Sequence, residues 1–320
     1  MKKLNVAVIG GGFMAKAHSM AYSCMPMFFW PAPFIPNRKV IIDVNDELAE
    51  DAKNKLGFDE GSTDWEEVVN RKDIDVVDIC TPNDTHPKMA IAAAKAGKHI
   101  ICEKPLARNA AEAKEMYDAV KDSNIIHMVA FNYRRTPAVA LAKKLIDDDK
   151  IGKILNFRGT YLQDWPADPN GPLSWRFQKE IAGSGTLGDI GTHVVDFARY
   201  LVGEISSVSS IAKTYIESRP IQQSENDTMD IRVGNTGGEK AKVDVDDEII
   251  TMMKFTDGAV GTIEATRNAY GRNNYLTFEV HGTKGSILFN YERRDELQVM
   301  FADSPGETRG FQTIYTGQAH

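Results

Sequence analysis

Short apolar runs alternate with amphipathic helical stretches through the first part of the chain. Five runs have the length and composition of buried strands: residues 4–9, 40–43, 76–80, 99–102 and 126–130. This alternation predicts a Rossmann-type α/β domain over residues 1–136, in which a doubly wound parallel sheet carries helices on both faces. Asn109 and Glu112 have capping-box spacing, which predicts a helix start at this point.

The pattern changes near residue 137 to longer strand-like runs. These runs cover residues 154–161, 208–216, 249–255, 260–266, 275–281 and 286–291. One helical pattern, residues 189–201, interrupts them, and Asp257-Gly258 between two runs is a hairpin signal. Residues 137–320 are therefore predicted to form an α+β domain with a large, mostly antiparallel open sheet.

Two segments do not fit the pattern. Residues 25–36 contain four prolines among aromatic and methionine side chains, and we expect no regular structure there. Residues 217–247 are nearly devoid of large apolar side chains, and we expect a long mobile loop.

Composition narrows the class of partner and the compartment. The formal net charge is −7 and the pI about 5.6, so the chain has no basic surface of the kind that nucleic acid or anionic membranes require. Cys24, Cys80 and Cys102 show no metal-binding spacing, which favours a reducing cytoplasm and no metal site. No stretch is long and apolar enough to predict a membrane span.

A glycine-rich turn follows the first predicted strand. Residues 10–15 read G-x-G-x-x-A, with Phe13 and Met14 opening the next helix. Gly10 permits a tight turn, Gly12 lets backbone N–H groups approach a pyrophosphate, and Ala15 permits close helix packing. Any glycine turn after a strand could give this pattern, so the motif alone is moderately specific.

Asp43, at the end of the second predicted strand, is the candidate ribose ligand. It lies farther from the glycines than the usual spacing of about 20 residues, and the 25–36 segment accounts for the excess. A carboxylate there repels a 2′-phosphate, so the sequence favours NAD over NADP. A reach toward phosphate by Arg38 or Lys39 would weaken this inference.

Two further groups could carry chemistry. Glu103 and Lys104 follow a strand at the ligand-binding edge of the predicted sheet, and Asp189 and His193 have i,i+4 helical spacing. By themselves, these pairs could equally be a solvated lysine with its partner and a capping aspartate beside a core histidine.

Together, these motifs resemble the glucose-fructose oxidoreductase/inositol dehydrogenase family (Gfo/Idh/MocA). The resemblance rests on the glycine turn, Thr81-Pro82-Asn83 with His86, Glu103-Lys104-Pro105, and Gly188-Asp189 with His193, in that order. It implies that Lys104, Asp189 and His193 surround a reacting carbinol. It also implies a nicotinamide side formed by Thr81, Pro82, Asn83, His86 and Glu103.

A finer resemblance points to family members that oxidise the 3-hydroxyl of levoglucosan, a 1,6-anhydro sugar. The stretches that carry it are residues 28–33, 127–135, 160–165, 175–178 and 290–295. We expect His193 to be the primary base with Lys104 and Asp189 relaying the proton, although the order stays open between His193 and Lys104. Family members generally continue with further helical sequence after this sheet, so the resemblance leaves open whether the chain is a C-terminally truncated fragment.

Aromatic and amide side chains offer a pocket for a neutral sugar. Besides Lys104, Asp189 and His193, the candidate substrate ligands are Tyr133, Gln163, Trp165 and Arg176. Further cofactor contacts are expected from Asn132, Trp175 and Arg176.

Three other functions remain as alternatives to levoglucosan oxidation: an inositol or other sugar dehydrogenase, an NAD-dependent glycoside hydrolase, and a non-catalytic NAD sensor. We also expect a homo-oligomer formed through the open face of the second sheet.

Overall fold

The computed structural model describes residues 1–221, 238–317 and 320. The chain divides into two compact units, Met1–Ala130 with Glu180–Gly183, and Phe131–Lys179 with Ser184–His320. Each is considered by itself below.

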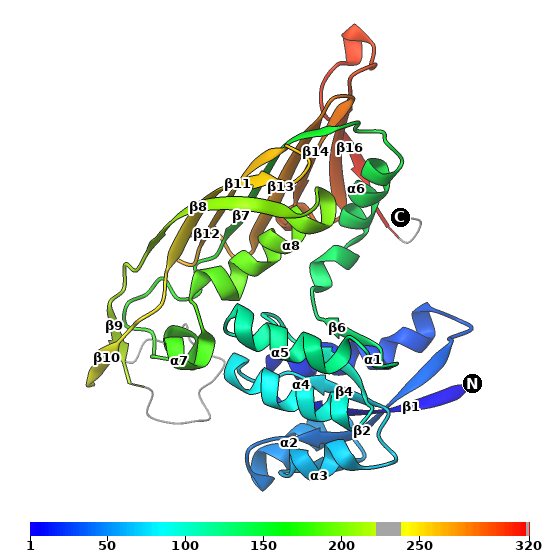
Figure 1. Cartoon of the computed structure of the whole chain (residues 1–320), viewed down its shortest axis with the longest axis vertical. Coiled ribbons are helices and arrows are strands. Elements are labelled where there is room, and N and C mark those ends of the chain that lie inside the picture. The colour runs from blue at the N-terminus through cyan, green and yellow to red at the C-terminus, as the bar shows by residue number, and fades with distance from the viewer. Residues whose placement is uncertain (222–237, 318–319) are drawn as a thin grey trace. The chain divides into compact units, whose positions relative to one another are not determined.

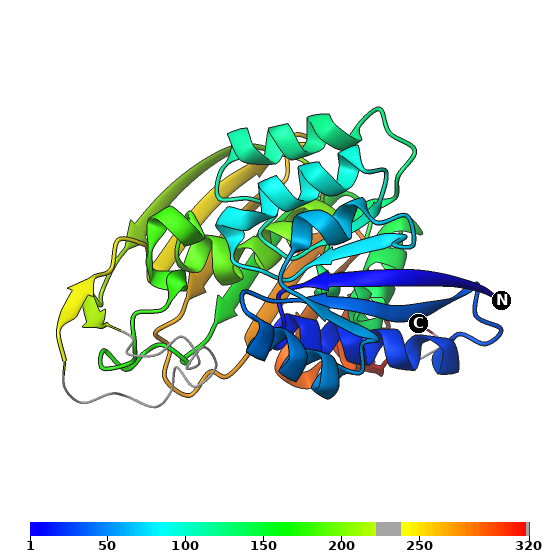
Figure 2. The same ribbon diagram turned by 90° about the horizontal axis from the view of Figure 1, so that it is seen from below.

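The first unit is a doubly wound sheet with strand order β3-β2-β1-β4-β5-β6, all parallel. Helices cover both of its faces (Figures 1 and 2). Its strands are β1 (Lys2–Ile9), β2 (Phe34–Ile42), β3 (Glu60–Ser62), β4 (Val76–Ile79), β5 (His99–Cys102) and β6 (His127–Val129). Its helices are α1 (Phe13–Phe28), α2 (Asp46–Leu56), α3 (Trp65–Asn70), α4 (His86–Lys95) and α5 (Ala110–Val120).

Alternation along β1 explains why both faces are covered. Val6 and Val8 pack with Ala15 of α1 on one face, whereas Ala7 and Ile9 pack with α3, α4 and α5 on the other. Successive side chains of a strand point to opposite faces, so an apolar run without alternation needs helices on both sides. The predicted cap of α5 is confirmed, since Asn109 Oδ1 accepts a hydrogen bond from the Glu112 amide at 3.0 Å.

The second unit is an eight-stranded sheet in the order β16-β15-β14-β13-β7-β12-β11-β8, antiparallel except for the β7–β12 pair. Helices α6 and α8 share one core cluster with the sheet, which confirms the predicted α+β class. The strands are β7 (Ile154–Leu162), β8 (Ile205–Lys213), β11 (Glu248–Phe255), β12 (Val260–Thr266), β13 (Tyr275–Gly282), β14 (Gly285–Asn290), β15 (Glu296–Phe301) and β16 (Gln312–Tyr315). The helices are α6 (Pro137–Asp147) and α8 (Thr192–Leu201). The short helix α7 (Lys179–Ala182) belongs to the first unit except for Lys179.

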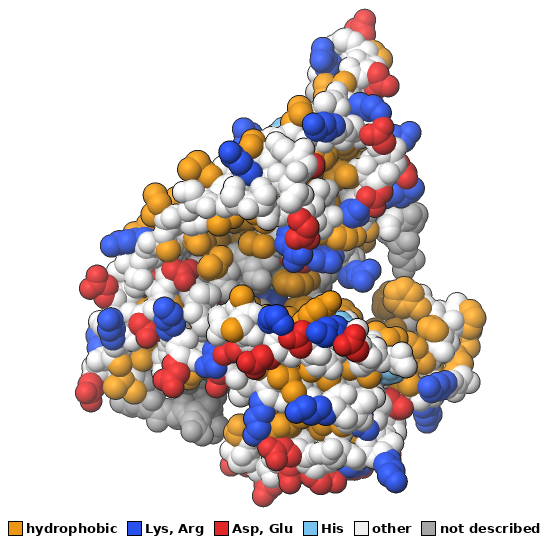
Figure 3. Space-filling view, in the orientation of Figure 1, with side chains coloured by type: hydrophobic (Ala, Val, Ile, Leu, Met, Phe, Trp, Pro, Cys, Tyr) orange, Lys and Arg blue, Asp and Glu red, His pale blue; other side chains and the backbone are white. Residues whose placement is uncertain are grey.

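The expectation of no regular structure over residues 25–36 was wrong at both ends of the segment, whereas residues 29–33 form no helix or strand, as expected. Helix α1 continues through Pro26 to Phe28, because a proline so close to a helix end removes a single backbone bond. Strand β2 begins at Phe34 and includes Pro36, which lies opposite Leu4 of β1. On its other side β2 pairs with β3 only at Val40–Ile42, so no strand there needs a hydrogen bond from the backbone nitrogen of Pro36. The exposed apolar side chains at the end of α1 form an orange group in Figure 3.

The expectation of a loop over residues 217–247 was wrong at both ends of the segment. Strands β9 (Ser218–Pro220) and β10 (Lys240–Lys242) pair with each other, and Val243 and Val245 pack against Phe177. Residues 222–237, the middle of the predicted loop, lie outside the described residues. Strands β3, β15 and β16 were not predicted at all. None of the helices in the described part of the chain is long and apolar enough to cross a membrane.

Candidate active site

The turn between β1 and α1 has the geometry that the glycine motif predicts. Gly10 has φ +94°, and a Cβ at this position would lie 2.9 Å from the carbonyl oxygen of Cys80. Its amide donates to Ile42 O at 2.8 Å, which ties the turn to the neighbouring strand. A side chain here would therefore be excluded both by φ and by the approach of β4.

The N-terminus of α1 is open to an anion. Gly12 caps the helix without a side-chain hydrogen bond, and the first turn contains no acidic residue. A Cβ added to Gly12 would meet no atom of the described residues within 4 Å. Uncapped N–H groups and the helix dipole attract negative charge, so this end of α1 fits the pyrophosphate of a dinucleotide. Phe13 and Met14 form the first turn beside it.

Asp43 is held beside the glycine turn by two backbone donors. Its Oδ2 accepts from the Gly11 amide at 3.0 Å and its Oδ1 from the Val44 amide at 2.8 Å. A Cβ on Gly11 would lie 2.7 Å from Oδ2, so the middle glycine is the one that admits the carboxylate. The remaining lone pairs of the carboxylate can accept hydrogen bonds from ribose hydroxyls.

The two nearby cations are engaged elsewhere in the first unit. Arg38 Nη1 donates to Leu56 O at 2.7 Å, and Lys39 Nζ lies 2.6 Å from Glu60 Oε1. Neither contact points to a 2′-phosphate site, so the preference for NAD stands.

The Thr81–His86 turn after β4 is braced by its own polar side chains. His86 is fully buried, with Nε2 2.9 Å from Thr81 O and Nδ1 3.0 Å from Pro105 O. Burial lowers the pKa of His86, and this effect outweighs the two carbonyl hydrogen bonds, which raise it. Asn83 Nδ2 donates to Ala182 O at 2.9 Å. Both side chains thus shape the backbone around Pro82.

Glu103 and Lys104 directly follow β5. The Glu103 side chain is buried, and its Oε2 accepts from the Lys104 amide at 3.1 Å. The Glu103 amide donates to Ile79 O at 2.9 Å, which extends the pairing of β5 with β4 by one residue. Lys104 is partly exposed at the carboxyl edge of the sheet. Ligands of open parallel sheets bind at this edge.

Asp189 and His193 belong to the second unit. A wide turn of π-helix, Leu187–Gly191, carries Asp189 and runs into α8, which carries His193. Asp189 Oδ2 lies 3.3 Å from Nη1 of Arg267, whose side chain is fully buried. His193 is buried, with 6 % of its surface exposed. Its ring lies edge-on to the ring of Tyr133, with the two centroids 4.6 Å apart. Helical turns of this widened kind often occur at functional sites.

A set of uncharged polar side chains lies beside His193. We call it the hydroxyl network, and it consists of Tyr133, Tyr161, Gln163 and Asn274. The Tyr161 hydroxyl donates to Asn274 Oδ1 at 2.5 Å and lies 3.0 Å from the Tyr133 hydroxyl, and it accepts from Gln163 Nε2 at 3.2 Å. Burial first, and then the Tyr133 hydroxyl, raises the pKa of Tyr161, so the Tyr161 hydroxyl stays neutral.

The remaining predicted ligands also belong to the second unit. Trp165 Nε1 donates to Gln163 Oε1 at 3.0 Å. The Arg176 guanidinium stacks over the Trp175 ring at 4.4 Å, and burial lowers the pKa of Arg176 while Asp189 opposes this. Asn132 is exposed in the short helical turn Asn132–Arg135.

Three residues of this region were missed from sequence: Tyr161, Asn274 and Arg267. Tyr161 could have been found, because it alternates with Gln163 along β7 and so shares its face. Asn274 precedes β13, whose Tyr275 pairs with Leu162, and only this register places it beside Tyr161. Arg267 follows β12 and has no local signal.

Two family models match the chain. The oxidoreductase family with an NAD-binding Rossmann fold matches residues 4–131, and the GFO/IDH/MocA C-terminal domain matches residues 139–288. The chain therefore belongs to the GFO/IDH/MocA family and is an NAD-binding oxidoreductase.

Particular relatives are also similar. Levoglucosan dehydrogenase of Pseudarthrobacter phenanthrenivorans is 65 % identical over 320 residues, which is 100 % of this chain and 82 % of that protein. The scyllo-inositol 2-dehydrogenase (NAD(+)) of Bacillus subtilis is 34 % identical over 84 % of this chain and 71 % of its own length. A solved structure of levoglucosan dehydrogenase in complex with NADH and levoglucosan is 64 % identical, with a TM-score of 0.94 over 100 % of this chain and 82 % of that one.

Proposed function

We propose that the chain oxidises the 3-hydroxyl of levoglucosan to a ketone with NAD as hydride acceptor. The observation that carries this proposal is the 65 % identity to a levoglucosan dehydrogenase over the whole chain. The hydroxyl network supports it, because a small neutral sugar is recognised by neutral donors and acceptors next to flat apolar rings.

The proposed roles of the chain's own residues follow from their contacts. Gly10, Gly12 and the first turn of α1 bind the pyrophosphate, and Asp43 binds the ribose. Thr81, Pro82, Asn83, His86 and Glu103 shape the nicotinamide side, with Asn132, Trp175 and Arg176 as further cofactor contacts. Tyr133, Gln163, Trp165 and Arg176 bind the sugar hydroxyls.

The proton of the reacting hydroxyl must leave as its carbon loses hydride. NAD, when bound, supplies the hydride acceptor. We assign the base to His193, and we assign Asp189 and Lys104 to the polarisation of the hydroxyl and the onward relay of its proton. Asp189 is held for this task by Arg267, at 3.3 Å.

The test is NADH formation at 340 nm with levoglucosan, scyllo-inositol and myo-inositol, each with NAD and with NADP. We expect levoglucosan with NAD to be preferred, and levoglucosan deuterated at C3 to transfer its label to the cofactor. Turnover of the inositols alone would contradict the substrate, and label retention in the sugar would contradict the position. Sugar release from aryl glycosides without net NADH would point to a glycoside hydrolase.

Lys104→Ala tests the site assignment. Loss of a group that polarises the hydroxyl and relays its proton should lower kcat by about 100-fold or more. Lys3→Ala, at an exposed position of β1, is the matched control. Near wild-type turnover of the Lys104→Ala protein would refute the assignment.

We further propose that copies of the chain associate through the outer face of the eight-stranded sheet. Ile250 and Met252 of β11 point away from the core, while Ile249 and Met253 point into it. Ile211 of β8 pairs with Ile250 and is 74 % exposed, so apolar side chains gather on the outer face. Ile211→Glu should reduce the mass in light scattering, and Tyr117→Glu on α5 is the control. An unchanged mass would contradict this interface.

We also propose a cytoplasmic location. Cys24, Cys80 and Cys102 form no disulfide, as in proteins kept in a reducing compartment. Fractionation of the source cells with an antibody to the chain would test it.

A further inference from the structure

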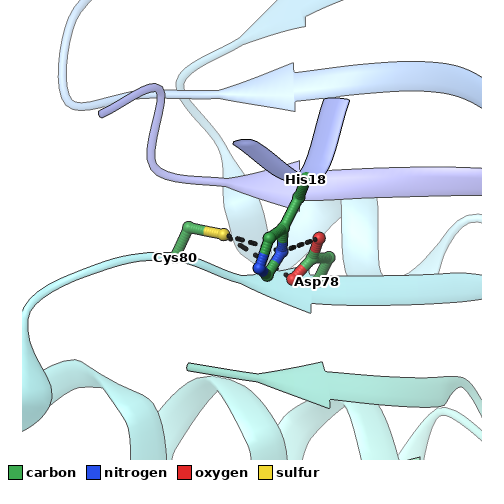
Figure 4. A group of neighbouring side chains, drawn as sticks. All are labelled: His18, Asp78 and Cys80. Atoms are coloured by element: carbon green, nitrogen blue, oxygen red, sulfur yellow. Dashed lines mark hydrogen bonds and ion pairs between the residues drawn. The ribbon is translucent and has the colours of Figure 1, made fainter. Parts of the chain in front are cut away.

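A charged cluster is buried in the first unit between α1 and the ends of β4 and β5. It consists of His18 and Tyr22 of α1, Asp78 of β4, Cys80 just after β4, and Glu103 just after β5. Figure 4 shows the His18 ring between the Asp78 carboxylate and the Cys80 sulfur. Asp78 is fully buried and Glu103 is 4 % exposed. No sequence motif pointed to this cluster.

Each ring nitrogen of His18 faces a carboxylate. Nδ1 lies 2.8 Å from Asp78 Oδ2, and Nε2 lies 3.1 Å from Glu103 Oε1. A neutral imidazole has one N–H donor, whereas an imidazolium has two. The geometry therefore suits a ring that is protonated on both nitrogens. Burial by itself lowers the pKa of His18, but the hydrogen bond to Asp78, with help from Cys80 and Glu103, raises it well above its ordinary value.

The cluster reaches the reactive loop through Glu103. Its Oε2 accepts from the Lys104 amide at 3.1 Å. Its Oε1 lies 3.1 Å from His18 Nε2 and receives no other hydrogen bond within the described residues. Without the His18 ring, this buried oxygen would lose its partner, and the Glu103 side chain would no longer be held against the Lys104 amide.

A metal ion is the competing occupant of this place. The ligand atoms of His18, Asp78 and Cys80 lie within 4.8 Å of one another. However, burial and then Asp78 raise the pKa of the Cys80 thiol, and a metal would need the thiolate. The 2.8 Å separation of Nδ1 and Oδ2 is that of a hydrogen bond. A proton between the two groups accounts for the geometry without a metal.

We propose that His18 is a positioning residue for the oxidation, an imidazolium whose Nε2 holds the Glu103 carboxylate and so fixes the turn that presents Lys104. The inference rests on the proposed function in one respect, the assignment of Lys104. His18 itself touches neither the sugar nor the reacting hydroxyl in this scheme.

The charge of His18 can be measured without any substrate. In protein labelled with ¹⁵N-histidine, one ring should keep imidazolium shifts on both nitrogens up to pH 9, and this signal should be missing in His18→Gln. Titration of that ring near its ordinary pKa would overturn the proposal. A shift of the signal on addition of Zn²⁺ alone, with loss of the Cys80 thiol proton, would overturn it in favour of a metal site.

Kinetics test the link to Glu103. His18→Gln should lower kcat at pH 7 by about 10- to 100-fold, as expected for a displaced catalytic group, with little change in NADH affinity. Glu103→Gln should lower kcat as well, and the double variant should be no worse than the poorer single variant. Multiplicative losses would contradict the mechanism.

Tyr22→Phe is the matched control. It deletes the hydroxyl that donates to Asp78 at 2.7 Å and leaves the His18–Glu103 pair in place, so kcat and its pH profile should stay near those of the wild type. If His18→Gln does not fold, the ¹⁵N measurement on the wild type still decides the charge, with Tyr22→Phe used to assign the perturbed ring. If Lys104→Ala retains activity while the imidazolium is observed, the site assignment fails and the charge assignment survives.

Discussion

Each unit contains a histidine of the proposed mechanism, and the two rings have different surroundings. In the first unit, His18 lies between the carboxylates of Asp78 and Glu103, at 2.8 and 3.1 Å. In the second, His193 lies among the rings of Phe131, Tyr133 and Tyr161, with the neutral hydroxyl network beside it. Two carboxylates beside a ring stabilise its imidazolium form, whereas the base proposed for the second unit must be able to accept a proton. The comparison separates a histidine held between carboxylates from one packed among aromatic rings.

The strongest test of this difference is the loss of the proposed base. His193→Ala should lower kcat by about 1,000-fold, within the range for removal of a general base, and should leave NADH binding intact. Steady-state kinetics with levoglucosan and NADH fluorescence titration measure the two effects. His281→Gln, a half-buried histidine paired with Ser286 on β13 and β14, is the control. Comparable losses in both variants would mean that His193 acts only through folding.

The sequence predicted the first unit better than the second, and the reason is the length of chain over which each site is built. The glycine turn and the Asn109 cap are local patterns whose spacing determines their geometry. Asp43 is recognisable because it ends a strand. The hydroxyl network depends on the pairing of Tyr275 with Leu162, more than 100 residues apart, and no local pattern specifies that register.

The same reasoning explains the failures in the first unit. His18 and Asp78 are 60 residues apart, and both lie in stretches whose apolar pattern accounts for the fold without them. Four prolines predict irregular chain at residues 25–36, but the effect of each proline depends on its position. Pro26 falls in the last turn of α1 and Pro36 on a part of β2 that β3 does not cover.

The pH dependence of stability tests the charge of the first cluster. A histidine whose pKa is raised in the folded state stabilises fully below its unfolded pKa, about 6.5, and loses that contribution as pH rises toward the folded value. The advantage of the wild type over His18→Gln/Glu103→Gln should therefore fall by up to about 1.4 kcal/mol per pH unit above pH 6.5. Urea denaturation from pH 6 to 9.5 measures it.

A substitution at a residue that does not titrate provides the baseline for that measurement. Asn109→Ala removes the cap of α5 and should cost about 1 kcal/mol at every pH. If the difference in free energy of unfolding between the wild type and the double variant were also the same at every pH, His18 would not be charged in the folded protein.

Two tyrosines allow the smallest and most specific comparison. Tyr161→Phe removes the hydroxyl shared by Tyr133, Gln163 and Asn274, so the KM for levoglucosan should rise by about 10-fold with little change in kcat. Tyr22→Phe removes a hydroxyl that donates to Asp78, so the KM for the sugar should not change. Because each substitution deletes one oxygen, the two proteins differ only in which polar group is disturbed. Equal changes in the KM for the sugar would show that the hydroxyl network does not select the substrate, whereas a change confined to Tyr161→Phe would assign sugar recognition to the second unit.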